Sequence, residues 1–84
     1  MVYSVITFAN THSAILSQKL LKDIISFTIM PTLREISNSC GISIRLSYDD
    51  IEIAKDTILQ KLEKNMFCFY KVTNQDGKNI IEKL

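Results

Sequence analysis

Cys40 is the residue whose type and neighbours most clearly suggest chemistry. It is one of two cysteines in a chain of 84 residues, and it lies in the polar stretch 34–41, directly before Gly41. A thiol becomes a nucleophile when it loses its proton, which nearby positive charge favours. Arg34 and the single histidine, His12, could supply that charge. The glycine permits a sharp turn and leaves the sulfur uncrowded, which makes Cys40 a candidate for a reactive thiol.

Each of these residues also has an ordinary structural explanation. A cysteine in a polar loop is commonly a small residue without a chemical role, and a histidine at a helix start is commonly solvated. Arg34 and Glu35 can pair across the loop, which contributes little stability at a surface. Cys68 lies between Phe67 and Phe69 and is expected to be a core residue.

Other kinds of site find little support in the sequence. There is no glycine-rich phosphate loop and no ligand spacing typical of a metal site. Two cysteines and one histidine cannot complete a structural zinc site. The charge balance of 10 Lys and Arg against 9 Asp and Glu leaves a net charge of +1, without the basic stripe of a nucleic-acid binder. We therefore expect no cofactor, no metal ion and no nucleic-acid partner.

The apolar segments indicate a protein that does not enter membranes. The longest apolar run free of charge, residues 24–33, is too short to cross a bilayer. The amino terminus lacks the positively charged start of a secretory signal. We expect a cytoplasmic protein, in which reducing conditions disfavour a disulfide between Cys40 and Cys68.

The hydrophobic pattern predicts one α+β domain over residues 1–84. With 46% apolar residues, the chain can build one core but has little room for a deep pocket. Pro31 restricts the second of the expected strands to a sheet edge or a strand end. Asp76 and Gly77 predict a turn, after which a short extra strand at residues 80–81 or a frayed helix can follow. Strands are predicted over residues 2–8, 26–33, 42–46 and 66–72, and helices over residues 13–25 and 51–62.

The predicted order β-α-β-β-α-β favours a ferredoxin-like two-layer sandwich. Right-handed crossovers place the loop after the first strand and the loop between the second and third strands at the same end of the sheet. Residues 10–13 and 34–41 should therefore be neighbours in space. The free amides at the start of the first helix favour an anion at this end.

The residues around Cys40 also resemble a known family. The segments Thr11–Ala14 and Pro31–Arg45 are similar to the small domains called putative selenium/sulfur carrier protein-like, and the similarity covers roughly residues 3–72. Its most specific part is the pattern PxxREISxSCGxxxR. The resemblance implies that Cys40 is the carrier residue. The better-understood sulfur-relay carriers differ, because their cysteine lies in a Cys-Pro-x-Pro turn and no proline follows Cys40.

A carrier needs one thiolate that accepts sulfur as Cys–S–SH, or selenium as Cys–S–SeH, and gives it to a second protein. The sequence therefore predicts a sulfur or selenium carrier rather than a self-sufficient enzyme, with proteins that deliver and accept sulfur or selenium as its partners. Arg45 falls on the strand face opposite Ile44, which is the open face of the expected sheet. The residues expected to support the thiolate or the transferred anion are Thr11, His12, Ser13, Arg34, Ser37, Ser39, Gly41 and Arg45.

The alternative is a non-enzymatic regulatory module that binds a small anion or dimerises. One face of a ferredoxin-like sheet is open, and apolar residues of the first and last strands could pack there against a second copy to form a homodimer. A small acyl-phosphate hydrolase of this topology is disfavoured, because the loop at residues 9–12 has neither arginine nor glycine. The residues considered for the dimer are Tyr3, Val5, Phe67 and Phe69.

Overall fold

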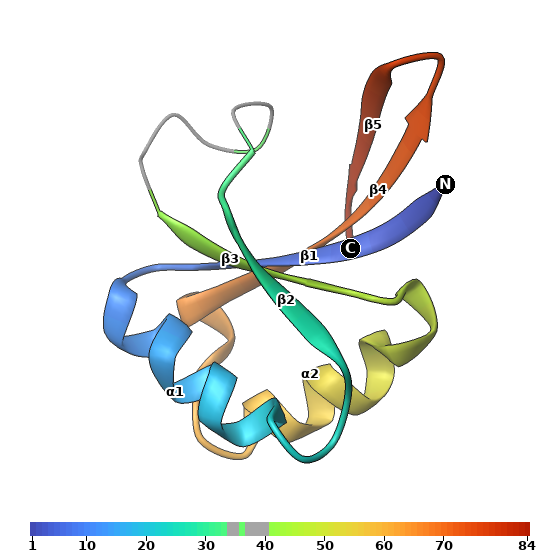
Figure 1. Ribbon diagram of the computed structural model, residues 1–84. Coiled ribbons are helices and arrows are strands. Elements are labelled where there is room, and N and C mark those ends of the chain that lie inside the picture. Colours follow the sequence, from blue (N-terminus) through green and yellow to red (C-terminus); the bar gives the residue numbers. More distant parts are fainter. Residues whose placement is uncertain (34–35, 37–40) are drawn as a thin grey trace.

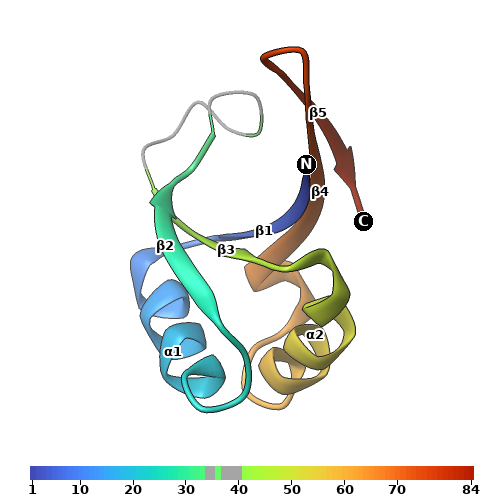
Figure 2. The ribbon, with the colours of Figure 1, turned by 45° about the vertical axis from the view of Figure 1, so that its right-hand side comes forward.

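A computed structural model describes residues 1–33, 36 and 41–84 and contains one antiparallel sheet with two helices (Figure 1). The strand order in the sheet is β2-β3-β1-β4-β5, and every neighbouring pair is antiparallel. Both helices cover the same face of the sheet, as Figure 2 also shows, so the fold has the predicted α+β class and two layers. In chain order the elements are β1 (Val2–Phe8), α1 (Thr11–Leu21), β2 (Phe27–Pro31), β3 (Ile42–Leu46), η1 (Tyr48–Asp50), α2 (Ile51–Leu59), η2 (Lys64–Met66), β4 (Phe67–Gln75) and β5 (Lys78–Lys83).

The fifth strand makes the topology different from the predicted four-stranded ferredoxin-like sandwich. The sheet is not the classic ferredoxin-like sheet of the βαββαβ motif, because β5 extends it beyond β4. The turn explains this extension. Asp76 and Gly77 have φ angles of 53° and 78°, which are the left-handed values of the two-residue turn that joins hairpin strands. The predicted extra strand is thus confirmed, and it is longer than residues 80–81.

The core lies between the sheet and the helices. Strand alternation points every second residue toward the helices, where these side chains meet the buried faces of α1 and α2. Phe67 and Phe69 are only 7% and 4% exposed, and their rings pack edge to face with centroids 5.7 Å apart. They belong to this core and not to the open face considered for a dimer. The fully assembled cluster consists of Ile6, Leu21, Ile44, Leu46, Ala54, Ile58, Phe67 and Phe69.

Helix α1 ends earlier than predicted. The sequence predicts a helix to residue 25, but the amides of Ile24 and Ile25 both donate to the carbonyl of Leu21 in a turn that closes the helix. Ile24 is consequently 49% exposed, whereas Ile25 packs against the core. Within the described part of the chain, neither helix has the length and apolarity needed to span a membrane.

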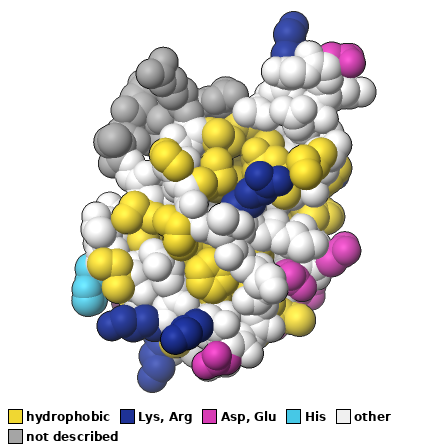
Figure 3. All heavy atoms as spheres, in the orientation of Figure 1, with side chains coloured by type: hydrophobic (Ala, Val, Ile, Leu, Met, Phe, Trp, Pro, Cys, Tyr) yellow, Lys and Arg dark blue, Asp and Glu magenta, His cyan; other side chains and the backbone are white. Residues whose placement is uncertain are grey.

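The sheet face away from the helices is partly covered. Alternation places Tyr3 and Val5 of β1 on this face, and Tyr3 pairs with Val72 of β4. Val5 and Val72 are fully buried, and Tyr3 is half-buried. Figure 3 shows hydrophobic side chains gathered across the middle of the molecule in this view. Dimerisation through this open face stays a prediction.

Candidate functional site

A pocket of about 360 Å³ lies where the β1–α1 connection meets the described residues of the β2–β3 connection. The sequence predicts that these two connections are neighbours, and the described residues confirm it. The two sides of the pocket come from parts of the chain that are more than twenty residues apart. The lining residues are Thr7, Phe8, Ala9, Asn10, Thr11, Thr32, Ile36, Gly41, Ile42 and Tyr70.

The β1–α1 wall is fixed by backbone bonds and by a helix cap. The amide of Ala9 donates to the carbonyl of Met66 at 2.9 Å, which holds the end of β1 against the start of β4. Asn10 then adopts an extended conformation, and its Oδ1 accepts the amide of Ser13 at 2.8 Å. This is an N-cap, which the small polar residues after the first strand predict. It positions Thr11 on the wall of the pocket.

The opposite wall is built on Thr32 and Gly41, the residues that continue β2 and precede β3. The amide of Thr32 donates to the carbonyl of Gly41 at 3.0 Å, and the Thr32 hydroxyl shares a hydrogen bond of 2.7 Å with Ser43 Oγ. A Cβ at Gly41 would lie 3.3 Å from Thr32 Oγ1. This close approach is one reason for a glycine at this position.

The predicted site residues have different outcomes. Thr11 and Gly41 line the pocket. His12 is exposed in the first turn of α1 and Ser13 is buried, and neither of them lines the pocket. The remaining predictions, Arg34, Ser37, Ser39 and Cys40, lie outside the described residues.

Arg45 belongs to a different region. Its guanidinium carbon lies 4.1 Å from the centre of the Tyr3 ring, and its Nη2 is 3.6 Å from the sulfur of Met1. It lines a second pocket of about 400 Å³, together with residues such as Phe27 and Asp50. Arg45 therefore faces away from Ile44, as predicted, but does not line the pocket beside Gly41.

Sequence reasoning missed several lining residues. Tyr70 lies on the face of β4 opposite Phe67 and Phe69, where it pairs with Val5 and reaches the pocket. Strand alternation separates Tyr70 from its aromatic neighbours and could have revealed this. No sequence pattern indicates that Ile36 lines the pocket, because it lies in a connection without alternating or helical hydrophobic spacing.

The second cysteine also differs from its prediction. Cys68 is half-buried and not part of the core cluster. It pairs with Thr7 of β1 and lines a small hollow of about 160 Å³ together with Ala9 and Met66. Cys68 is therefore a matched second thiol for experiments on Cys40.

The described lining of the pocket carries polar, uncharged groups. It offers hydroxyl groups, one amide side chain and the phenol of Tyr70, and no charged side chain among the described residues contributes to it. Such groups can donate hydrogen bonds to a small ligand. The described residues also contain no group of three potential ligands that could hold a metal ion.

Comparisons with known proteins connect this site to a family. Neither the comparison with curated proteins nor the comparison with solved structures finds a match. A family profile does match residues 3–66, which include the β1–α1 connection, both ends of the β2–β3 connection and Cys40. The chain therefore belongs to the family described as putative Se/S carrier protein-like.

Proposed function

We propose that the protein carries sulfur or selenium on Cys40 and transfers it to a partner protein. The observation that supports this proposal is the position of Gly41, which is bonded directly to Cys40 and lines the pocket that also contains the start of α1. A group attached to Cys40 is thus only one residue away from a wall rich in hydroxyl and amide donors. The family match covers the same segment.

The transfer consists of two exchanges at sulfur. The Cys40 thiolate attacks the outer sulfur of a donor persulfide, R–S–SH, and the donor thiolate R–S⁻ leaves, so that Cys40–S–SH forms. The thiolate of an acceptor then attacks the same outer sulfur, and the Cys40 thiolate is released. No external oxidant is needed, because the outer sulfur keeps its oxidation state throughout. A donor of the type R–S–SeH would deliver selenium by the same two steps.

The pocket has the role of holding the transferred atom. Thr11 and Thr32 carry hydroxyl groups that can donate to a terminal sulfur or selenium, and Asn10 fixes the wall on which Thr11 lies. Because the described lining is uncharged, it does not hold the group as tightly as a cluster of arginines would. Weak retention suits a carrier, which must release its load.

This function implies a location and partners. A carrier that depends on a free thiol needs a reducing compartment, so we place the protein in the cytoplasm. Its partners are the protein that supplies the sulfur or selenium and the protein that accepts it. In this proposal the chain is a carrier and catalyses no complete reaction by itself.

Intact-mass measurement after incubation with a low-molecular-weight persulfide tests the site of uptake. The wild-type protein and Cys68→Ser should gain one sulfur atom that peptide mapping assigns to Cys40, and Cys40→Ser should gain none. Uptake on Cys68 alone would contradict the proposal. If cells that carry Cys40→Ser in place of the wild-type protein showed no defect, the protein would be better explained as a module that binds an anion or dimerises.

A further inference from the structure

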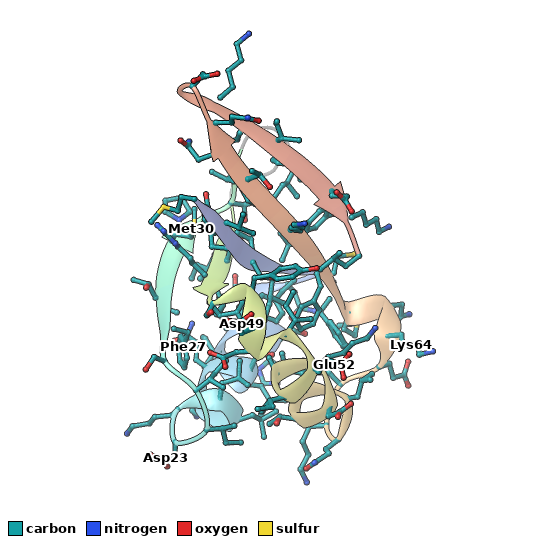
Figure 4. The ribbon with its side chains drawn as sticks, turned by 90° about the vertical axis from the view of Figure 1, so that its right-hand side faces the viewer. Asp23, Phe27, Met30, Asp49, Glu52 and Lys64 are labelled. Carbon is teal, nitrogen blue, oxygen red and sulfur yellow. The ribbon has the colours of Figure 1, made fainter. Side chains whose placement is uncertain are left out.

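Strand β5 forms an outer edge of the sheet that lies away from the helices. It pairs with β4 on one side only, from Lys78 opposite Gln75 to Lys83 opposite Tyr70. Figure 4 shows the β4–β5 hairpin projecting at the end of the molecule opposite Asp23. The turn end of this edge is therefore open to a second strand, whereas Lys83 and Leu84 at its other end share a hollow with Lys55 of α2 and Lys64 of η2.

The backbone of β5 presents hydrogen-bonding groups on this edge. The amide of Leu84 donates to the carbonyl of Phe69 at 2.9 Å, which fixes which residues bond to β4. In an antiparallel pair, hydrogen-bonded residues recur at every second position. Glu82, like Leu84, therefore directs its backbone groups toward β4, whereas Ile81 and Lys83 direct theirs outward. Such an edge can pair with a further strand.

The exposed side chains of β5 have an order that is complementary to itself. Lys78, Ile80 and Glu82 alternate along one face of the strand, and all three are exposed. Ile80 is 52% exposed. Along this face a positive side chain, Lys78, is followed by the apolar Ile80 and the negative Glu82. When two copies of β5 pair antiparallel with their Ile80 residues opposite each other, Lys78 of each copy lies opposite Glu82 of the other.

We propose that β5 pairs antiparallel with β5 of a second copy, about a two-fold axis at Ile80, to form a continuous ten-stranded sheet in a homodimer. In this arrangement Ile80 meets Ile80 of the other copy, and each Lys78 faces a Glu82. Opposite charges directly across two strands attract, and like charges repel. The interface is isologous, as most homodimer interfaces are.

The charges select this register over its neighbours. Moving the axis by one residue in either direction would place Ile80 opposite a charged side chain, either Lys78 or Glu82. Moving it to Glu82 would place two carboxylates against each other. The pattern therefore permits one pairing and disfavours the others, which is how edge strands avoid indiscriminate association. Because the paired segment is short, the dimer is weak and depends on protein concentration.

Sedimentation velocity over a series of protein concentrations tests the proposal. The wild-type protein should shift from monomer to dimer as its concentration rises. Lys78→Glu should raise the dissociation constant by about tenfold or more, because both charge pairs of the symmetric dimer become repulsive. Lys61→Glu makes the same charge change at an exposed residue beyond α2 and should leave the constant unchanged. Circular dichroism of each variant verifies folding.

A mixing experiment gives the sharpest result. Glu82→Lys should also fail to dimerise alone, but an equal mixture of Lys78→Glu and Glu82→Lys should form a heterodimer in which the charges at positions 78 and 82 are opposite across the interface. Because Glu82 is paired with Lys71 within each chain, circular dichroism must show that Glu82→Lys keeps its fold. Restored association also shows that both variants are folded. A wild-type protein that stays monomeric, a dimer that ignores Lys78→Glu, or a mixture that does not associate would each overturn the proposal. The dimer does not use Cys40, so Cys40→Ser should dimerise as the wild type does.

Discussion

The amide of Thr32 donates a hydrogen bond to the carbonyl of Gly41, with 3.0 Å between the nitrogen and the oxygen. The hydroxyl of the same threonine shares a hydrogen bond of 2.7 Å with Oγ of Ser43, which is fully buried. These two bonds hold the end of β2 to the start of β3. They fix the position of Gly41, the residue that follows Cys40 in the sequence and lines the pocket.

Replacing Thr32 with Val should lower the free energy of unfolding by about 1 kcal/mol, because the buried hydroxyl of Ser43 loses this partner. Urea denaturation measures the change. Thr28→Val is the matched control, since Thr28 lies on the same strand with an exposed side chain and should shift the free energy by less than about 0.5 kcal/mol. Equal effects of the two substitutions would contradict the role given to Thr32.

Gly41→Ala should destabilise the protein through Thr32. The added Cβ would lie 3.3 Å from Thr32 Oγ1, so the hydroxyl must move and weaken its bond to Ser43. We expect a cost of about 1 kcal/mol in the wild-type background and a smaller cost when Thr32 is already Ala. A double-mutant cycle in urea measures this coupling. Costs that simply add would show that the contact with Thr32 is unimportant.

Ser17→Ala and Ser4→Ala should have different effects although both serines are fully buried. Among the described residues Ser17 Oγ is a buried side-chain atom without a hydrogen-bond partner, so its removal should be neutral or stabilising. Ser4 Oγ donates to the carbonyl of Tyr70 at 2.9 Å, and its loss should cost about 1 kcal/mol. Thermal unfolding of the two variants distinguishes them, and a larger loss for Ser17→Ala would be the contrary result.

Gly77→Ala should weaken the β4–β5 hairpin. Gly77 has a φ of 78°, which costs a residue with a Cβ about 1–2 kcal/mol. The global free energy of unfolding should fall by roughly that amount, and the amides of β5 should exchange faster with solvent. Gly77→Asn should lose less, because asparagine tolerates left-handed angles better. Hydrogen exchange that is unchanged in β5 would argue against this explanation.

The sequence was informative wherever a local pattern determines the structure. Alternation predicted the strands at residues 2–8 and 42–46. The missing amide of Pro31 predicted a sheet edge or a strand end, and β2 is an edge strand that ends at Pro31. The polar residues after β1 predicted a helix cap, which Asn10 provides. The right-handed crossover rule predicted that the two connections of the pocket lie at the same end of the sheet.

The rest depended on interactions between distant segments. The length of β5 is set by its pairing with β4, and its own residues give only a weak strand signal. Alternation gives the face of β4 on which Tyr70 lies, but the position of Tyr70 beside the pocket depends on the β1–β4 register, which no local pattern fixes. Arg45 lies over the ring of Tyr3, through a contact between two strands that only the folded sheet brings together.

The central claim is that Cys40 carries one transferable sulfur atom. The most direct test loads the protein with a persulfide donor, removes the donor, adds cyanide, and measures the thiocyanate released per chain. The wild-type protein and Cys68→Ser should each release about one equivalent, as expected for a single carrier thiol, and Cys40→Ser should release none. Equal release from Cys40→Ser, or sulfur bound to Cys40 that cyanide cannot remove, would contradict the account.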